Sequence, residues 1–223
     1  VSGLALAGDD AANYWLEPAA SVEGCSISRA ENAWASSPAV RVDGWTYGGE
    51  PSAPAAQAAF GTPSFSYADA EEGPFGDLPA KPHAGTWYAK ASVAGTGNYG
   101  ALESAPTAFE IAPARLAGLS AEASLTRNQP GCTTTVDLSK LLPSDAGGSP
   151  AYAVASRTDA GLTGAEVDAS SGVLALEADD RDPAEGAVDV VAVAVTGMLN
   201  YEDASVEVSV GYSDKATATV DGV

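Results

Sequence analysis

Hydrophobic and polar residues alternate with a period of two in several short stretches, which is the pattern of a β-strand with one buried face. In residues 87–93, Trp87 shares one face with three apolar residues, and in residues 205–210 valine alternates with Ser and Glu. The almost continuously apolar run 188–195 predicts a central strand. We find no helix-length apolar periodicity bounded by caps. The pattern therefore predicts an all-β fold.

Turn-forming residues are frequent between these stretches. The chain has 24 Gly and 14 Pro, and its hydrophobic fraction of 45% comes more from Ala and Val than from Leu, Ile and Phe. This mixture is typical of short strands joined by many turns. Further segments with strand character are 64–67, 134–143, 151–154 and 172–176.

An Asn-Tyr pair recurs along the chain and is followed each time by a segment that alternates or ends apolar. The pairs are Asn13-Tyr14, Asn98-Tyr99 and Asn200-Tyr201, at spacings of 85 and 102 residues. Asn tolerates turn or left-handed backbone between two strands, and a Tyr suits the start of the outgoing strand. Because an immunoglobulin-type sandwich has about 100 residues, each pair is interpreted as the last hairpin of one β-sandwich module.

This spacing divides the chain into three parts, and the fold expected is a tandem of immunoglobulin-like β-sandwich modules. Residues 1–29 are the C-terminal remnant of a preceding β repeat, with 21–27 as its final strand. Residues 30–112 form a second module, and residues 113–223 form a third that ends in a linker from about residue 213. The remnant is too short to enclose a core, so we expect it to pack on the second module or pair with another chain.

The negative charge of the chain argues against polyanionic partners. Thirty acidic against ten basic residues give a formal net charge of −20, which repels nucleic acid and anionic membrane surfaces. The acidic residues are spread along the chain, so a soluble, self-repelling surface is the simplest interpretation, and we expect a monomer. The chain has no run of about 18 apolar residues and starts without a leader pattern, so we expect its export signal or anchor to lie outside this segment.

Titratable residues do not form a recognisable catalytic set. His83 is the single histidine, which excludes an imidazole-based metal cluster and a His-based triad, and its Pro-rich surroundings predict a loop. Cys25 and Cys132 fall in different modules, so a buried thiol is expected and a disulfide is the less favoured alternative. The pair Glu71-Glu72 is interpreted as a solvated turn. No catalytic, cofactor or metal residues are predicted.

A calcium site and an internal lysine–asparagine bond stay open as less favoured alternatives. The acidic residues 179–182, with Glu177 and Glu185 nearby, lack the spacing of a calcium loop, so a solvated turn is favoured over a calcium site. Lys90 and Lys140 are candidates for an internal lysine–asparagine bond, although their strand faces look polar.

Aromatic side chains are the best candidates for ligand binding. Exposed rings could stack on sugars, and the set considered is Trp15, Trp34, Trp45, Tyr47 and Trp87. Core packing accounts for most of them. The pair that we single out for ligand binding is Trp45 and Tyr47, in the loop before two glycines.

The segment from Trp45 to Tyr99 carries the motifs WTYGG, PSAP, GTPSFSY, PHAGTWYAKA and TGNY. It resembles the tandem immunoglobulin-like repeats, of the MBG/YDG type, in large surface proteins of Gram-positive gut bacteria. Residues 1–28 resemble the end of the related glycine-rich adhesin repeats, and residues 133–212 resemble a cadherin-like or immunoglobulin-like repeat. Trp87 stands where the family usually has a Tyr.

The resemblance implies a secreted protein attached to the bacterial cell wall, and it supplies no catalytic residues. We therefore expect a non-enzymatic stalk that presents a distal domain to an unidentified host or cell-wall ligand. One alternative is a glycan- or protein-binding adhesin module that uses the exposed aromatics. The other is a set of accessory β domains of an extracellular hydrolase.

Overall fold

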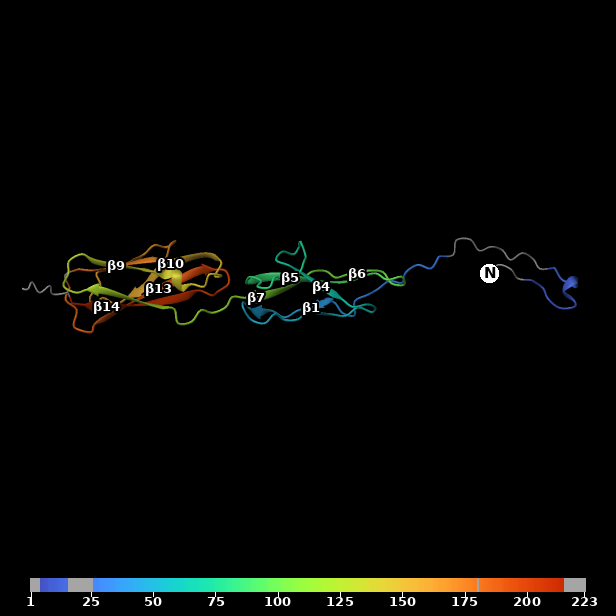
Figure 1. Ribbon diagram of the computed structural model, residues 1–223, viewed down its shortest axis with the longest axis horizontal. Coiled ribbons are helices and arrows are strands. Elements are labelled where there is room, and N and C mark those ends of the chain that lie inside the picture. The colour runs from blue at the N-terminus through green and yellow to red at the C-terminus, as the bar shows by residue number, and fades with distance from the viewer. Residues whose placement is uncertain (1–4, 16–25, 180, 215–223) are drawn as a thin grey trace, which may run out of the picture.

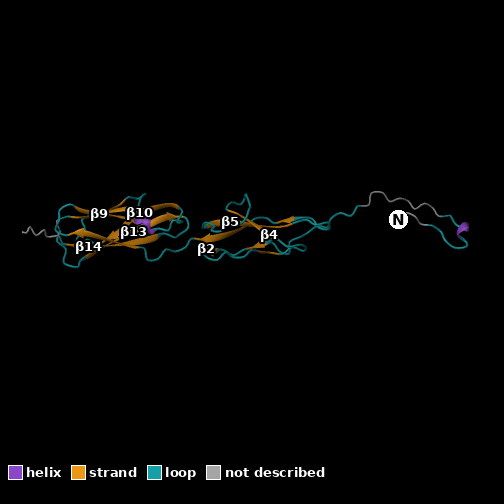
Figure 2. Ribbon diagram, viewed as in Figure 1, coloured by secondary structure: helices purple, strands orange, loops and turns teal. Residues whose placement is uncertain are grey.

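The computed structural model describes residues 5–15, 26–179 and 181–214. Figure 1 shows two β modules that lie end to end along the long axis. We keep the names second module for residues 30–112 and third module for residues 113–214. In the described residues the only helical segments are two short 3-10 turns, η1 (Ala11–Asn13) and η2 (Leu138–Leu141), which Figure 2 shows among strands and loops. None is long and apolar enough to cross a membrane.

The third module is a sandwich of a four-stranded and a three-stranded sheet. One sheet has the order β10-β13-β14-β8 and the other the order β11-β12-β9. The strands are β8 (Ser120–Thr126), β9 (Cys132–Asp137), β10 (Gly148–Arg157), β11 (Gly164–Val167), β12 (Val173–Ala178), β13 (Val188–Met198) and β14 (Ala204–Ser213). All pairs are antiparallel except β14 with β8, which run parallel.

This strand order confirms the predicted fold class. The order β9-β12-β11 corresponds to strands B, E and D of an immunoglobulin domain, and β10-β13-β14 corresponds to C, F and G. The first strand, β8, pairs with the last strand, β14, instead of with β9. The third module is thus an immunoglobulin-like β-sandwich.

Inward-facing side chains of both sheets form the core of the third module. On β14, Val206, Val208 and Val210 are fully buried, as the alternation of the sequence predicts. The predicted central strand 188–195 lies within β13, which pairs with β10 on one side and β14 on the other. However, Asp189, the one charged residue within this apolar run, is itself completely buried.

A tight turn before β12 supports this core. Gly172 has a φ of +72°, and a Cβ built on it would lie 2.6 Å from the ring of the buried Tyr152. Gly172→Ala should therefore lower the free energy of unfolding by about 2 kcal/mol, from left-handed backbone strain plus overpacking. Gly186→Ala is the control, because Gly186 has a similar φ of +77° and open space around it. Urea denaturation should show a loss of about 1 kcal/mol for the control. Equal losses for the two variants would show that the contact with Tyr152 adds nothing to the effect.

The second module is smaller and has shorter strands. Its main sheet has the order β2-β7-β5-β4, with β6 also on β5, and a separate pair joins β1 to β3. The strands are β1 (Val40–Arg41), β2 (Trp45–Thr46), β3 (Ala55–Ala56), β4 (Ser64–Ala68), β5 (Gly85–Val93), β6 (Leu102–Glu103) and β7 (Thr107–Ala112).

The long strand β5 provides one wall of a separate core in the second module. Its buried face is Trp87, Ala89, Ala91 and Val93, which is the face that the sequence predicts. Phe109 and Ile111 of β7 pack with this face. The two modules therefore enclose two cores.

The N-terminal segment is described only in part. Most of the predicted final strand 21–27 lies outside the described residues, and Ser26 and Ile27 are not in a strand. The side chain of Ile27 is fully exposed. Asn98 and Asn200 lie in bends, but the left-handed backbone allowed for them is not found, because among the described residues Asn128 is the only non-glycine with a positive φ. Neither Asn98 nor Asn200 is left-handed, so another reason for asparagine is needed.

Candidate functional site at the junction of the modules

The linker that enters the third module is held by a parallel backbone bridge to the tip of the last hairpin, between β13 and β14. The Ala114 N–H donates to the Asn200 carbonyl at 2.9 Å, and the Glu202 N–H donates to the Ala114 carbonyl at 2.8 Å. Arg115 Nε adds an exposed ion pair with Glu202 at 2.8 Å. These bonds fix the direction in which the chain leaves β7.

The side chain of Asn200 joins the two modules. Its Oδ1 accepts the Ala84 N–H of the second module at 2.9 Å. Its Nδ2 donates to the Asp145 carbonyl of the third module at 2.7 Å. Ala84 is 1% exposed and Asn200 is 7% exposed. A short amide that both donates and accepts is what the buried Ala84 N–H and the partly buried Asp145 carbonyl require, and this explains the asparagine.

Asp145 is the second polar centre of the junction. Its Oδ2 accepts the hydroxyl of Tyr47 at 3.0 Å, and its Oδ1 accepts the hydroxyl of Tyr201 at 3.1 Å. Lys81 of the second module forms an ion pair with the same carboxylate. The hydrogen bond from Lys81, followed by that from Tyr47, lowers the pKa of Asp145 to about 2. The carboxylate is therefore charged at neutral pH and binds groups from both modules.

Apolar contacts surround these polar groups. The rings of Tyr47 and Tyr201 meet edge to face, with centroids 5.6 Å apart. Tyr201 packs against the core of the third module and also against the core of the second module. Ala114 also packs against the second core. Residues of the third module thus seal one end of the second core.

The loop before β10 holds Asp145 at the junction. Gly147 and Gly148 have φ values of +61° and +72°, which turn the chain sharply after Ala146. The Ala146 carbonyl accepts the N–H groups of Leu199 and Asn200 at 3.1 and 2.9 Å. This loop and the hairpin tip therefore form one unit that faces the second module.

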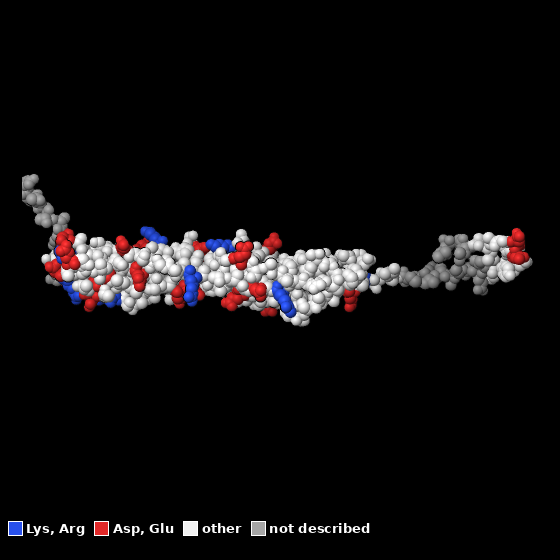
Figure 3. Space-filling model, turned by 90° about the horizontal axis from the view of Figure 1, so that it is seen from below, with Lys and Arg blue, Asp and Glu red and all other residues white. Residues whose placement is uncertain are grey.

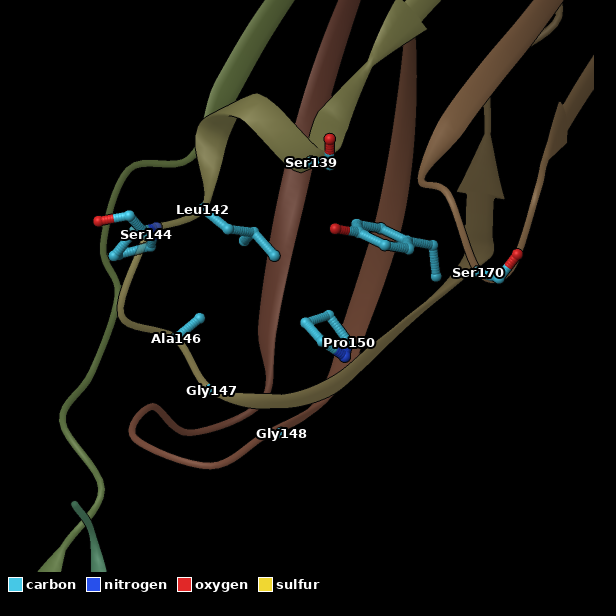
Figure 4. Close-up of a pocket in the computed structure, with 10 residues that line it drawn as sticks. Ser139, Leu142, Ser144, Ala146, Gly147, Gly148, Pro150 and Ser170 are labelled. Carbon is cyan, nitrogen blue, oxygen red and sulfur yellow. The ribbon is translucent and has the colours of Figure 1, made fainter.

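A shallow cavity of about 340 Å³ lies behind this loop. Figure 4 shows Ser139, Leu142 and Ser144 on one side of it and Pro150 and Ser170 on the other. It offers small hydroxyl and apolar groups, and among the described residues no cluster of His, Cys, Asp and Glu could hold a metal ion.

The two predicted ligand-binding residues lie next to the junction but in different settings. Tyr47 is only 6% exposed and is bonded to Asp145, so the expectation of an exposed ring is wrong for Tyr47. Trp45 is half-buried and stacks on Phe109 with centroids 5.2 Å apart. The chain therefore uses Tyr47 for contact between its own modules.

The other candidate residues lie apart from the junction or at its edge. His83 is a half-exposed loop residue whose Nδ1 lies 2.9 Å from the Ala84 carbonyl. Lys90 and Lys140 form ion pairs with Glu103 and Asp137, at 3.7 and 3.1 Å. The internal lysine–asparagine bond stays a less favoured prediction.

The acidic residues and the cysteines are the remaining candidates from the sequence. Of the run 179–182, residue 180 lies outside the described residues, and Asp182 and Asp214 form ion pairs with Arg127. The exposed pair Glu71-Glu72 lies in a turn. Cys132 is a free, half-buried thiol, and Cys25 lies outside the described residues.

Two residues of the junction were not found from the sequence. Asp145 lies in a stretch of Pro, Ser, Gly and Ala that indicates only a turn, and Lys81 lies beside two prolines. The repeated Asn-Tyr pair was the available signal, and it identified the hairpin tip without its partners.

Comparison with known proteins gives only distant likenesses. No protein-family model and no curated protein matches the chain. A structure of Drosophila N-cadherin EC1-4 is similar at 15% identity and a TM-score of 0.32, over 77% of this chain and 48% of that chain. The titin I-band fragment I67-I69 is similar at 9% identity and a TM-score of 0.31, over 84% of this chain and 67% of that chain.

An endo-fucoidan hydrolase of glycoside hydrolase family 107 is similar at 11% identity and a TM-score of 0.30, over 87% of this chain and 31% of that chain. The chain thus spans about half or less of the cadherin and hydrolase structures. The immunoglobulin-like assignment rests on the strand order of the third module.

Proposed function

We propose that the chain is a non-enzymatic stalk region of a large bacterial surface protein, in which β modules in series present a distal domain. The proposal places it outside the cell, attached to the cell wall through other parts of the protein. The motifs that resemble MBG/YDG-type repeats support this location. The observation that carries the proposal is the sealed junction, in which Asn200 and Asp145 bind backbone and side chains of both modules.

A stalk must keep its modules in line. Modules joined by a linker move independently by default, unless their interface is large and hydrophobic, so a polar junction must hold them by specific bonds. Here a buried amide, a carboxylate shared by two tyrosines and a ring packed on both cores act together. Figure 3 shows acidic side chains over both modules without one dominant patch, which suits a surface that repels other chains.

The test measures whether the two modules tumble as one body. In the wild-type chain, ¹⁵N relaxation should give both modules one common rotational diffusion tensor. In Asp145→Ala the second module should gain independent motion, because the links to Tyr47 and Lys81 are lost. Asp203→Ala is the matched control, since Asp203 is exposed in the neighbouring β13–β14 hairpin and its side chain makes no hydrogen bond to the described residues. Independent tumbling of the wild-type modules would contradict a rigid stalk.

Acid should loosen the junction in a defined range. The pKa of Asp145 is lowered in the folded chain, so its contribution is complete above the ordinary value of 3.8 and is lost as the pH falls toward about 2. Between these pH values the two wild-type modules should gain independent motion and approach the behaviour of Asp145→Ala. Asp145→Ala itself should change less over the same range.

A second candidate function is ligand binding at Trp45. A hollow of about 280 Å³ opens beside this half-buried ring, which lies where the sequence predicts a ligand-binding aromatic. Its lining consists of Trp45, Gly48, Gly49, Pro51, Ala80, Lys81 and Pro82. The full chain on a glycan array tests this function, and a chain that binds no glycan argues against it.

A further inference from the structure

The outer end of the second module has the same backbone bridge as the junction. The Ala30 N–H donates to the Asn98 carbonyl at 2.7 Å, and the Gly100 N–H donates to the Ala30 carbonyl at 2.9 Å. Ala30 and Tyr99 form a parallel bridge, as do Ala114 and Tyr201. Each module is thus entered by an alanine that pairs with the Asn-Tyr tip of its own last hairpin.

The side chains at the outer end remain exposed or half-exposed. Asn98 is exposed, and its side-chain amide has no hydrogen bond to the described residues, whereas the side chain of the equivalent Asn200 is buried and bonded on both sides. Phe60 stacks on Tyr99 with centroids 3.7 Å apart and is 44% exposed. Both the N–H and the carbonyl of Phe60 are bonded by the Asn32 side chain, at 3.1 and 2.8 Å. This end is therefore an ordered aromatic surface with an unused amide.

The chain that leads into this end also matches the chain that leads into the junction. Ile27 lies three positions before Ala30, and Ile111 lies three positions before Ala114. Ile111 is completely buried in the second core, where it pairs with Trp45. Ile27 is fully exposed. Its position is therefore that of a core residue in the last strand of another β module.

The outer end of the second module carries little charge, which favours an uncharged partner surface. On the face that Figure 3 shows, this end of the second module carries few charged side chains, whereas the third module carries many. A surface that offers an aromatic ring and a backbone N–H group can bind both the aromatic pair and the amide oxygen. Such a surface exists in this chain, at the opposite end of the second module.

We propose that the Asn98–Tyr99 end of the second module docks onto a β module whose C-terminal end is built like that of the second module itself. This inference rests on the proposed stalk function and names the partner of the module end. The backbone N–H at the position of Ala84 would bind Asn98 Oδ1, and the ring at the position of Tyr47 would pack on Tyr99 and Phe60. At the outer end the ring of Tyr99 contacts the apolar ring of Phe60, whereas at the junction Tyr201 contacts the carboxylate of Asp145. Because a phenyl ring does not titrate, this second junction should be less sensitive to acid.

The test lengthens the full chain by one module. A second copy of residues 29–112 is inserted after Ala112, so that Arg29 and Ala30 of the inserted copy follow β7 of the first copy. With ¹⁵N confined to the first copy by segmental ligation, its Ala84 amide should exchange slowly with solvent. The first copy should also tumble with the rest of the chain.

Asn98→Ala in the inserted copy should abolish the slow exchange of Ala84 and the common tumbling of the first copy. The matched control is Asn98→Ala in the first copy, where the amide faces solvent, and it should change neither. Either of two results overturns the inference. One is a first copy that tumbles independently while the native junction of the inserted copy with the third module stays rigid. The other is docking that does not depend on Asn98.

Loosening of that native junction in the same molecule would instead count against the proposed stalk function, so the two failures are distinguishable. Separately ligated samples with ¹⁵N in the inserted copy or in the third module report on that native junction, and retained strand signals in each sample show that the lengthened chain is folded.

Discussion

Replacing Asp189 by asparagine should destabilise the third module by about 3–5 kcal/mol, because several buried donors lose their acceptor. The completely buried carboxylate accepts the N–H groups of Ala160, Gly161 and Leu162 at 2.8, 2.8 and 3.0 Å. It also accepts the hydroxyls of Thr158 and Tyr212. An amide presents an NH₂ group to some of these donors and leaves buried N–H groups unpaired. Urea denaturation followed by circular dichroism measures the loss.

Glu207→Gln is the control for this substitution. Glu207 lies on the adjacent strand β14 with its side chain exposed, and it makes no side-chain hydrogen bond to the described residues. Its replacement should change stability by no more than about 0.5 kcal/mol. Equal stability of Asp189→Asn and the wild type would contradict the assigned role of this carboxylate.

The effect of Asp189 should depend on pH. Burial by itself would raise the pKa of Asp189, but the hydrogen bonds from Thr158, Tyr212 and the backbone together lower it well below its usual range. A lowered folded-state pKa means that the contribution is complete above the unfolded value of about 3.9 and declines as the pH falls below it. The stability difference between wild type and Asp189→Asn should therefore shrink in acid.

Removal of the Asn200 amide should open the junction. Asn200→Ala leaves the Ala84 N–H and the Asp145 carbonyl without their partner, and two such groups cost about 2–4 kcal/mol if they stay buried. The modules escape much of this cost by separating, since water can then bind both groups. We therefore expect loss of common tumbling in ¹⁵N relaxation, faster exchange of the Ala84 amide, and a lower stability of the chain.

Asn98→Ala is the matched control for this prediction. Asn98 holds the same place in the hairpin of the second module, but its side chain is exposed. The bridge to Ala30 uses the backbone of Asn98 and is unaffected. If Asn98→Ala and Asn200→Ala had the same effect, asparagine would act through hairpin geometry and the bonds across the junction would be irrelevant.

Short-range patterns were sufficient for much of the fold. The two-residue period predicted the buried face of β5 and the strand β14, and the apolar run 188–195 predicted the central strand β13. These patterns work because a strand in a sandwich buries alternate side chains. The same pattern could not show that Asp189 points inward, since most of the donors that satisfy it come from a loop about 30 residues earlier and one comes from Tyr212 on the next strand.

The Asn-Tyr repeat located the important hairpins but its interpretation was incomplete. Asparagine was expected for its turn conformation, yet Asn200 acts through its side chain toward Ala84, which lies 116 residues away in the chain. Tyr47 was expected as an exposed ligand platform and is instead bonded to Asp145. Both errors have one physical cause, because a surface residue of one module becomes buried when the next module docks on it.

The sequence by itself determined an all-β chain of repeated modules, since strand period and turn composition are local properties. Only the tertiary structure decided which polar residues hold the modules together. Asp145 and Lys81 carry no signal in the sequence, and they meet the Asn200 hairpin because the two modules bring distant loops to one place. A hydrogen bond needs a partner within about 3 Å, and that proximity is set by packing of the whole chain.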